Sequence, residues 1–555
     1  MSATLSRAVP GLRAFAGYRR SWLSADLLAG ATLWAMLVPQ SLGFAVLAGL
    51  PPVIGLYTAV GAMITYLWWG SSRVLNVGAE STVALMVATT LTVHASPGSE
   101  EYVDLAVVLA LLVGLFLVIG GLLGLGRAAD FLSRPVLAGY VFGSGVLIVS
   151  SQLEGFVGAS IDPTPYLTEV GAVVRNLDQA DLTAVCFGAV SLILVLALRR
   201  FLPAVPGALI AVAGSIAVVA AFDVDVTVVG AFDSGLPSIG LPAVGLDDVG
   251  MLVGPALAIA LLVYPDSALT ARSLTVGTPD RIDADREFFG VGAANLGAGL
   301  LGGFPVNGSQ SRSFVLRDAG ARSQVANLVA AALVVLTLVA LAPIFDYLPT
   351  ATLAAIVIVA GISLFDVAEF QAFWRYRRSE FWTAVATVAA VLGLGMLVGI
   401  AVAIGLTMLL MVLRAADATG AVLGRLPGTD TYRDIDDHVG AVTVPGLLLY
   451  RFDAPLFFAN AGRLRDEVLA LQEEQQARCV VLDLETTHDI DSSAIQVLHE
   501  LLDELDRRGV SLELARVRTE VHALVRVGGV EERLADRRVH LEVDDAVTSF
   551  QQRNG

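Results

Sequence analysis

The chain carries its apolar residues in long runs up to about Arg414, and beyond that point charged and apolar residues alternate over short distances. A helix needs about 20 mainly apolar residues to cross the hydrocarbon core of a bilayer. Full runs and shorter broken ones together predict about 14 membrane segments, all of them helical. They lie near residues 26–48, 53–69, 79–93, 103–125, 135–152, 183–200, 204–222, 249–273, 287–303, 310–318, 324–344, 350–365, 380–396 and 397–414.

The connections between these segments alternate in charge. Arginines follow the even-numbered segments, as at Arg73, Arg199 and Arg272, whereas the odd connections are poor in arginine and often acidic. Basic residues concentrate in cytoplasmic loops, so both termini are expected on the cytoplasmic side of the cell (inner or plasma) membrane. Residues 1–25 are polar, contain arginines and show no cleavable signal, which predicts a cytoplasmic N-terminal segment before a transmembrane domain at 26–414.

Two kinds of segment recur at matching places in the two halves of the membrane domain. Residues 38–42 and 264–268 each place a proline, a polar residue and a serine inside an apolar run. The segments near 79–93 and 310–318 are both short, and both begin with small or polar residues. Because each half has seven segments, the second copy must be inverted relative to the first. The pattern therefore predicts a 7+7 inverted repeat.

Paired broken segments in inverted halves indicate where a transporter binds its substrate. A helix that begins inside the membrane has unpaired N–H groups and a partial positive charge at its start. Two such ends that face one another can bind an anion without many cationic side chains, and Arg312 would add a full charge at the second end. The alternative is that these breaks are only irregular packing turns.

The C-terminal part of the chain has the pattern of an α/β domain. Residues 478–484 form a buried-strand pattern between charged residues, and residues 491–507 form an amphipathic helix. Helices packed on a sheet bury such patterns, so residues 441–555 are expected to form a separate domain after a linker at 415–440. The apolar face of the predicted helix consists of Ala494, Val497, Leu498, Leu501 and Leu505.

Composition narrows the function classes. With 55% hydrophobic and 16% charged residues, the chain is too apolar for an ordinary soluble enzyme, and its net charge of −17 argues against nucleic acid as a partner. Cys186 and Cys479 fall in different domains, so no disulfide is expected. The spans contain no nucleophile–base pair and no set of metal ligands, so we expect neither enzymatic activity nor a metal or cofactor.

Several of these stretches resemble the SulP family of sulfate permeases and related anion transporters. The resemblance covers essentially the whole chain, with motifs in the expected order. It implies core and gate bundles in the membrane domain, a cytoplasmic STAS domain at the C-terminus and a homodimer. The matching stretches are residues 38–41, 49–57, 302–306, 311–313, 423–429 and 450–461.

The resemblance also implies a binding site between the starts of the third and tenth segments, beside residues of the first and eighth. Many family members have Gly-Pro where this chain has Gly78 and Ala79. Since alanine keeps its backbone N–H, the shape or hydrogen bonding of the site is expected to differ slightly here. Carried over to this sequence, the substrate-binding residues are Gln40, Phe44, Ala79, Glu80, Ser81, Ser311 and Arg312.

Asp266 is the most informative single residue because an acidic side chain in mid-membrane is costly and usually functional. Burial favours a neutral carboxyl group, so Asp266 could gain and release a proton. Alternatively it stays ionised and binds Na⁺ together with Thr270, one helical turn away on the same face. A third interpretation is a permanent ion pair, for instance with Arg312, that only stabilises the fold.

Two further sites leave alternatives open. Glu80 at the start of a half-helix favours its charged form, yet it would then repel an anion, so it either points away or titrates with the substrate. In the C-terminal domain, residues 491–494 resemble the phosphorylation turn of anti-sigma antagonist STAS proteins, which makes Ser492 and Ser493 candidate phosphate acceptors. The alternative for these serines is an N-cap role.

The leading hypothesis is a secondary active transporter that moves a small oxyanion, with sulfate first, by alternating access and in symport with H⁺ or Na⁺. A Na⁺-coupled bicarbonate transporter and a dicarboxylate transporter remain alternatives within the same class. Two alternatives belong to other classes. One is an uncoupled anion channel, and the other is a signalling protein whose spans merely anchor the STAS domain.

Overall fold

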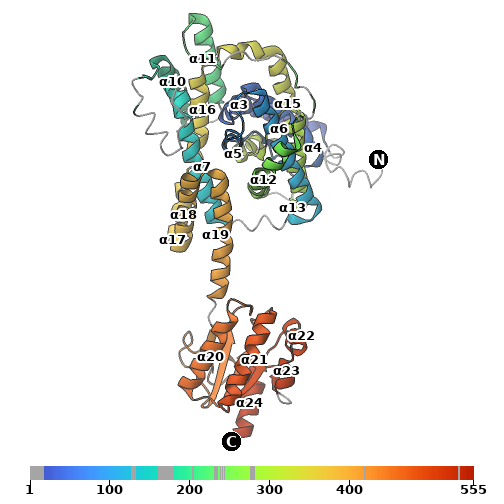
Figure 1. Ribbon diagram of the computed structural model, residues 1–555, viewed down its shortest axis with the longest axis vertical. Coiled ribbons are helices and arrows are strands. Elements are labelled where there is room, and N and C mark those ends of the chain that lie inside the picture. Colours follow the sequence, from blue (N-terminus) through green and yellow to red (C-terminus); the bar gives the residue numbers. More distant parts are fainter. Residues whose placement is uncertain are drawn as a thin grey trace, which may run out of the picture. The chain divides into compact units, whose positions relative to one another are not determined.

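The computed structural model describes residues 18–126, 133–159, 175, 179–202, 205–229, 235–237, 239–240, 242, 244–275, 282–417, 420–534 and 538–554. Residues 1–17, most of the predicted N-terminal segment, lie outside these ranges. The chain divides into two compact units, residues 1–407 and 408–555, and each is described by itself below (Figure 1).

The first unit is helical. Nearly every helix matches one predicted membrane segment within a few residues, because the lengths of the apolar runs follow the thickness of the bilayer. Its helices are α3 (Leu23–Leu47), α4 (Pro52–Trp69), α5 (Ser81–Leu91), α6 (Glu100–Leu122), α7 (Arg134–Ser151), α8 (Leu153–Val157), α10 (Leu182–Phe201), α11 (Gly207–Phe222), α12 (Leu246–Leu274), α13 (Ala284–Leu300), α14 (Gln310–Asp318), α15 (Val325–Leu336), α16 (Thr350–Ile362), α17 (Val367–Tyr376), α18 (Arg378–Leu394) and α19 (Met396–Ala416).

Within the described residues, nine helices or continuous helix pairs are long and apolar enough to cross a membrane. The other predicted segments correspond to the shorter helices α5, α11, α13, α14 and α18. The amphipathic helix α17 lies between the twelfth and thirteenth predicted segments and was not expected as a span. The prediction of an all-α membrane domain is therefore confirmed.

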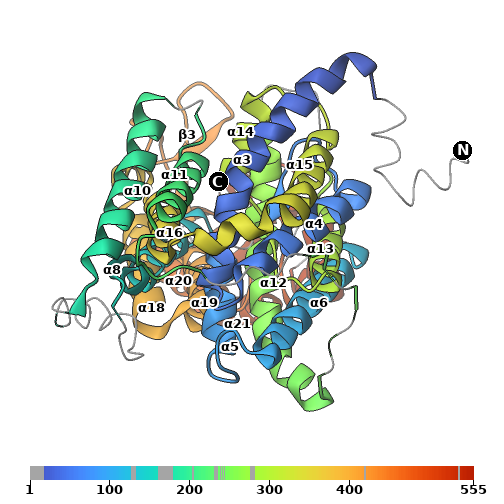
Figure 2. The same ribbon diagram turned by 90° about the horizontal axis from the view of Figure 1, so that it is seen from above.

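The helices of the first unit form two bundles. α3, α4, α6, α12, α13 and α15 pack together in one bundle, and α7, α10, α11, α16 and α18 gather beside it (Figure 2). Glycines allow the closest contacts in the first bundle: a Cβ on Gly61 of α4 would lie 2.4 Å from the carbonyl oxygen of Gly297 on α13. Small residues at such crossings are typical of membrane helices.

Two short strands lie within the helical unit. β1 (Val77–Gly78) pairs antiparallel with β2 (Asn307–Gly308), with Val77 opposite Gly308 and Gly78 opposite Asn307. Inside a membrane, extended backbone must find hydrogen-bond partners in the protein, and each strand supplies them for the other. Because β1 precedes α5 and β2 precedes α14, the pairing brings the starts of the two short helices together.

Two buried carboxylates stabilise the first bundle, and the sequence pattern did not single them out. Asp26 on α3 accepts hydrogen bonds from the backbone N–H of Arg322 at 2.7 Å and from the Ser323 hydroxyl at 2.8 Å. Glu287 on α13 accepts one from the Tyr66 hydroxyl at 2.5 Å and others from Ser71. Both carboxylates have several donors, as buried charges require, so we assign them structural roles.

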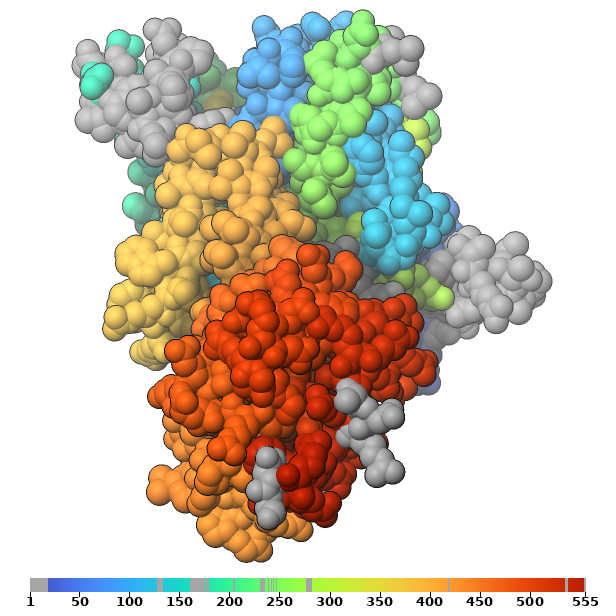
Figure 3. Space-filling model, turned by 60° about the horizontal axis from the view of Figure 1, so that its bottom comes forward, coloured from blue at the N-terminus to red at the C-terminus, as the bar shows by residue number. Residues whose placement is uncertain are grey.

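The second unit is built on a six-stranded sheet with the order β4-β3-β5-β6-β7-β8, in which β5 to β8 are parallel. Figure 3 shows the surface of this unit in orange to red. Its elements are β3 (Gly420–Arg425), β4 (Tyr432–Asp434), β5 (Leu447–Phe452), α20 (Ala461–Gln475), β6 (Cys479–Asp483), α21 (Ser492–Arg507), β7 (Ser511–Ala515), α22 (Thr519–Val527), α23 (Val530–Arg533), β8 (Val539–His540) and α24 (Val543–Asn554).

The predicted strand and amphipathic helix of this unit are confirmed as β6 and α21. Cys479 in β6 is fully buried, and burial raises the pKa of its thiol to about 12, so the thiol stays neutral and unreactive. The predicted linker at 415–440 is wrong, because β3 and β4 lie within it and belong to the sheet. Its turn-rich sequence did not reveal the edge strand β4 or its neighbour β3, which pairs with β4 on one side and with the distant β5 on the other.

Candidate functional site

The site is centred on the two half-helix starts. The backbone N–H of Ser309, just before α14, donates to the carbonyl oxygen of Asn76, just before β1, at 2.9 Å. Together with the β1–β2 pairing, this bond fixes the distance between the two starts. Each start has backbone N–H groups without partners in its own helix and a partial positive charge.

Arg312, in the first turn of α14, is fully buried and links the two starts. Its Nε donates to the side-chain oxygen of Asn76 at 2.7 Å, and its Nη2 donates to the carbonyl oxygen of Ala79 at 2.7 Å. Its Nη1 makes only one longer contact, 3.4 Å to the side-chain oxygen of Gln40 on α3. The structure thus brings together three of the predicted residues, Gln40, Ala79 and Arg312.

The start of α5 is capped by the side chain of Glu80. One carboxylate oxygen accepts from the backbone N–H of Thr82 at 2.8 Å, and the other accepts from the Ser81 hydroxyl at 2.8 Å. Both printed side-chain contacts of Glu80 are thus with the first turn of its own helix, and the two alternatives for its role stay predictions. The carboxylate lies on the donors that an anion at α5 would use.

The start of α14 is different. Its N-cap residue, Ser309, makes no side-chain capping bond, and the first bond within the helix runs from the Ser313 N–H to the Ser309 carbonyl. The Ser309 and Ser311 hydroxyls lie 3.5 Å apart, and Ser311 is exposed. No side chain among the described residues therefore caps this helix start, which leaves its first N–H groups available to a ligand.

Asp266, on α12, is attached to β2. Its carboxylate accepts from the side-chain amide of Asn307 at 2.5 Å, and the oxygen of that amide accepts from the Ser267 hydroxyl at 2.7 Å. The Ser267 oxygen in turn accepts from the Gly308 N–H at 2.9 Å. Thr270, the predicted second ligand of Na⁺, is buried one helical turn further along α12. The structure therefore connects Asp266 to the strand that leads into α14.

Three charged side chains of the site, Glu80, Asp266 and Arg312, interact electrostatically. Glu80 lies within electrostatic range of both Asp266 and Arg312. The hydrogen bonds of Arg312 go to Asn76, Ala79 and Gln40, and within the described part of the chain it forms no ion pair with Asp266. The same described residues contain no group of three or more His, Cys, Asp or Glu side chains that could hold a metal ion.

Two buried hydroxyl groups at the site are unusual. Both Tyr140, on α7, and Ser41, on α3, are fully buried; the Ser41 hydroxyl has no hydrogen-bond partner among the described residues, and the Tyr140 hydroxyl interacts with the side chain of Ser144 on the same helix. Tyr140 lies within electrostatic range of Glu80 and Asp266. Buried polar groups are normally paired, so these hydroxyl groups are exceptions within the first unit.

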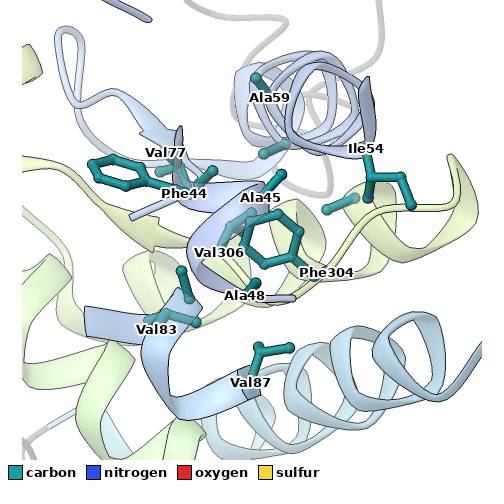
Figure 4. Close-up of a cluster of buried hydrophobic side chains, with 14 of the residues drawn as sticks. Phe44, Ala45, Ala48, Ile54, Ala59, Val77, Val83, Val87, Phe304 and Val306 are labelled. Carbon is teal, nitrogen blue, oxygen red and sulfur yellow. The ribbon is translucent and has the colours of Figure 1, made fainter. Parts of the chain in front are cut away.

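Phe44 contributes differently from the polar residues. Its side chain is 4% exposed and belongs to the apolar cluster drawn in Figure 4, together with Val77, Val83 and Phe304. This cluster surrounds the strand pair and excludes water from it. Phe44 therefore lies in the apolar wall around the strand pair, and its predicted contact with the substrate stays a prediction.

Two asparagines of the site were missed by the sequence reasoning. Asn76 binds Arg312 and also donates to the side chain of Asn327 at 2.7 Å, while Asn307 joins Asp266 to β2. The signal was present, because each asparagine is an amide within an apolar stretch just before a broken helix. Such side chains are costly to bury unless they are hydrogen-bonded.

In the second unit, Ser492 and Ser493 are both exposed at the start of α21. The N-cap is Asp491, whose carboxylate accepts from the backbone N–H of Ala494 at 2.8 Å and of Phe458 at 2.9 Å. The N-cap alternative for the serines is therefore wrong. Aspartate is an equally good cap and stands one residue earlier, at the extended position that a cap requires.

Comparison with known proteins shows the family to which the two units are similar. Residues 23–387 match the sequence model of the sulfate permease family, and residues 438–546 match that of the STAS domain. A probable sulfate transporter of Mycobacterium tuberculosis is 38% identical over 549 residues, which are 98% of this chain and 98% of that protein. The chloroplastic sulfate transporter 4.1 of Arabidopsis thaliana is 32% identical over 97% of this chain and 82% of its own length.

Solved structures show the same fold. The murine solute carrier 26 family member A9, an anion transporter in the inward-facing state, aligns with a TM-score of 0.91 at 22% identity, over 100% of this chain and 95% of that chain. The transmembrane domain of the cyanobacterial bicarbonate transporter BicA aligns with a TM-score of 0.61 at 22% identity, over 70% of this chain and 99% of that chain. Given these matches, the chain belongs to the sulfate permease family of membrane transporters and carries a C-terminal STAS domain.

Proposed function

We propose that this protein is a secondary active transporter of sulfate, that sulfate binds between the starts of α5 and α14, and that H⁺ or Na⁺ moves with it through Asp266. The observation that carries the proposal is the buried guanidinium of Arg312 between two helix starts that are held together by β1 and β2. A tetrahedral dianion offers acceptor oxygens in several directions, which suits donors that converge from different elements.

Sulfate is favoured over other anions because the relatives that match the whole chain at 38% and 32% identity are named sulfate transporters. The bicarbonate transporter BicA is a structural relative at 22% identity, and at this level the likeness concerns the fold alone. We include in the proposal a homodimer and a membrane orientation with both termini cytoplasmic.

Coupling through Asp266 has a direct physical route. A proton or a Na⁺ ion on this carboxylate changes its bond to the Asn307 amide, and Asn307 is part of β2, three residues before the start of α14. A change of charge at Asp266 therefore acts on the position of the helix start that holds the anion. The same bond gives sulfate binding a reciprocal effect on Asp266, as linkage requires.

Uptake of labelled sulfate into proteoliposomes tests the proposal. We expect accumulation that is driven by an inward H⁺ gradient or by an inward Na⁺ gradient, and that an excess of unlabelled sulfate suppresses more strongly than bicarbonate or a dicarboxylate does. Currents that are insensitive to both gradients would instead identify an anion channel. Absence of uptake for every anion would favour a membrane-anchored signalling protein.

The role of Asp266 is tested by the substitution Asp266→Asn, which keeps the shape but removes the titratable charge. We expect sulfate equilibration without gradient-driven accumulation. Glu101→Gln, at an exposed position in the first turn of α6, serves as the matched control and should accumulate sulfate normally. Unchanged accumulation by Asp266→Asn would remove this residue from the coupling role.

A further inference from the structure

We propose that Asn327, on α15, is a positioning residue of the anion site. Through Asn76 it orients the guanidinium of Arg312, so that one nitrogen of this group, Nη1, is left for the transported anion. This inference rests on the proposed function of the same site. It adds to that function a residue that touches no substrate and acts only through Arg312.

The supporting observation is a chain of hydrogen bonds between buried side chains. Arg312 Nε donates to the side-chain oxygen of Asn76 at 2.7 Å, and the Asn76 amide nitrogen donates to the side-chain oxygen of Asn327 at 2.7 Å. The amide nitrogen of Asn327 then donates to the side-chain oxygen of Gln324 at 2.8 Å. All four side chains are buried, so water does not compete for these bonds.

Both ends of this chain dictate the same orientation of its amides. A guanidinium can only donate, so the Asn76 atom that faces Arg312 must be the oxygen. At the other end, the Gln324 amide nitrogen donates to the backbone carbonyl oxygens of Ser72 and Leu75, each at 2.9 Å, and a carbonyl oxygen can only accept. The chain therefore has a single direction of donation, which runs from the guanidinium to the backbone carbonyls.

The chain fixes the guanidinium because that group is planar and rigid. Nε is held by Asn76, and Nη2 donates to the carbonyl oxygen of Ala79 at 2.7 Å. Two held nitrogens determine where the third one lies. Among the described residues Nη1 has only the 3.4 Å contact to Gln40, so Nη1 is the nitrogen whose N–H groups remain for an anion.

A purely structural role explains the three amides less well. Their burial costs free energy unless every amide is bonded, and apolar side chains of the same shape could join α15 to the segment before β1 at little or no cost. A buried guanidinium, by contrast, needs an acceptor. An acceptor that is itself held in place also holds the donor, and Arg312 thus explains why amides stand here.

The first test is Asn327→Leu, which removes the amide with little change in volume. Asn76 then loses the acceptor that fixes its orientation, and Arg312 loses its alignment. We would measure sulfate affinity by isothermal titration calorimetry on the purified full chain in detergent. The affinity should fall about tenfold, by analogy with residues that orient the ligands of a metal ion.

A second variant keeps Asn327 and interrupts the chain one link further along. Gln324→Met should weaken sulfate binding about threefold, because Asn327 retains its bond to the Leu75 carbonyl oxygen. This variant provides the test if Asn327→Leu fails to fold. The matched control is Tyr102→Phe, which removes a buried hydrogen bond of 2.8 Å to the Ala48 carbonyl oxygen in the same bundle and should leave sulfate affinity unchanged.

The substitution Arg312→Lys separates positioning from a structural role. Lysine keeps the charge but lacks the planar fork, so it cannot be held at two nitrogens. In this background Asn327→Leu should change sulfate affinity less than about twofold, whereas its effect on thermal unfolding should be the same as in the wild-type background. A structural role predicts the same loss of sulfate affinity in both backgrounds.

The outcomes distinguish this inference from the proposed function. Equal sulfate affinity of Asn327→Leu and wild type, with both proteins folded by their thermal unfolding curves, would overturn the positioning role and leave sulfate transport standing. Equal losses in the arginine and lysine backgrounds would overturn it as well. A wild-type protein that binds no sulfate would instead overturn the proposed substrate.

Discussion

The starts of α5 and α14 have the same backbone arrangement but carry side chains of opposite charge. Each short helix follows a two-residue strand, and the two strands pair with one another. At α5 the chain places its own carboxylate, Glu80, on the helix start. At α14 no described side chain caps the helix start, and a buried guanidinium, Arg312, stands beside it.

This difference shows how two halves with similar backbones can present different charges at their helix starts. Backbone symmetry supplies two similar positive ends, because helix geometry alone creates them. The side chains then make the two ends different, because the Glu80 carboxylate caps the start of α5 whereas the buried Arg312 guanidinium lies beside the start of α14. Four substitutions at these two ends test the comparison, and they follow from the largest expected effect to the smallest.

Arg312→Gln should have the largest effect. It removes the buried charge that joins α14 to Asn76 and Ala79 and leaves their oxygens without a donor. If Arg312 attracts the bound dianion, removing one partner of such a buried charge pair costs about 2–5 kcal/mol of binding free energy, so sulfate affinity should fall about 100-fold or more. Calorimetric titration measures this loss, with the exposed Arg317→Gln, five residues further along α14, as the control. A loss below threefold would contradict a central role for Arg312.

Tyr140→Phe should have the next largest effect. It removes only a buried hydroxyl that interacts with the Ser144 side chain on the same helix, so the fold should change little. If that hydroxyl donates to the bound anion, sulfate affinity should fall about tenfold, the usual size of a hydrogen bond to a charged group. Thermal unfolding together with titration would separate this result from a packing defect. An unchanged affinity would show that the anion does not reach α7.

Gln310→Glu should have a smaller effect and would make the two ends more alike. Gln310 lies two residues after Gly308, as Glu80 lies two residues after Gly78. A carboxylate at this exposed position in the first turn of α14 should weaken sulfate binding about threefold at neutral pH, and less at low pH. The control is Gln310→Asn, which carries no charge. Tighter binding by the glutamate variant would contradict the view that α14 attracts the anion.

Ala79→Pro should have the smallest effect. It restores the Gly-Pro sequence of many family members and removes one backbone N–H, while the Ala79 carbonyl that binds Arg312 remains. Gly78 is already extended in β1, as a residue before proline prefers to be. Sulfate uptake in proteoliposomes should change less than about twofold. A tenfold loss would show that the Ala79 N–H itself binds the substrate.

Much of the site could be read from the sequence because costly features are visible locally. Asp266, Arg312 and the two broken segments are exceptions within apolar runs, and the bilayer tolerates such exceptions only where they are functional or well bonded. Asn76 and Asn307 carried the same kind of signal and were overlooked. Asp26 and Glu287 could not be sorted from functional acids without their partners, since only the described contacts show them fully bonded.

Sequence by itself determined the number and length of the membrane helices, the inverted repeat and the broken segments, because these depend on contiguous residues and on the thickness of the bilayer. Tertiary structure alone decided that Glu80 caps α5 and that Asp266 binds Asn307 rather than Arg312. It also decided that β3 and β4, within the predicted linker, belong to the six-stranded sheet. Those outcomes depend on residues far apart in the chain. Arg312 and Asn76, for example, are separated by 236 positions, and only close packing brings such partners within hydrogen-bonding distance.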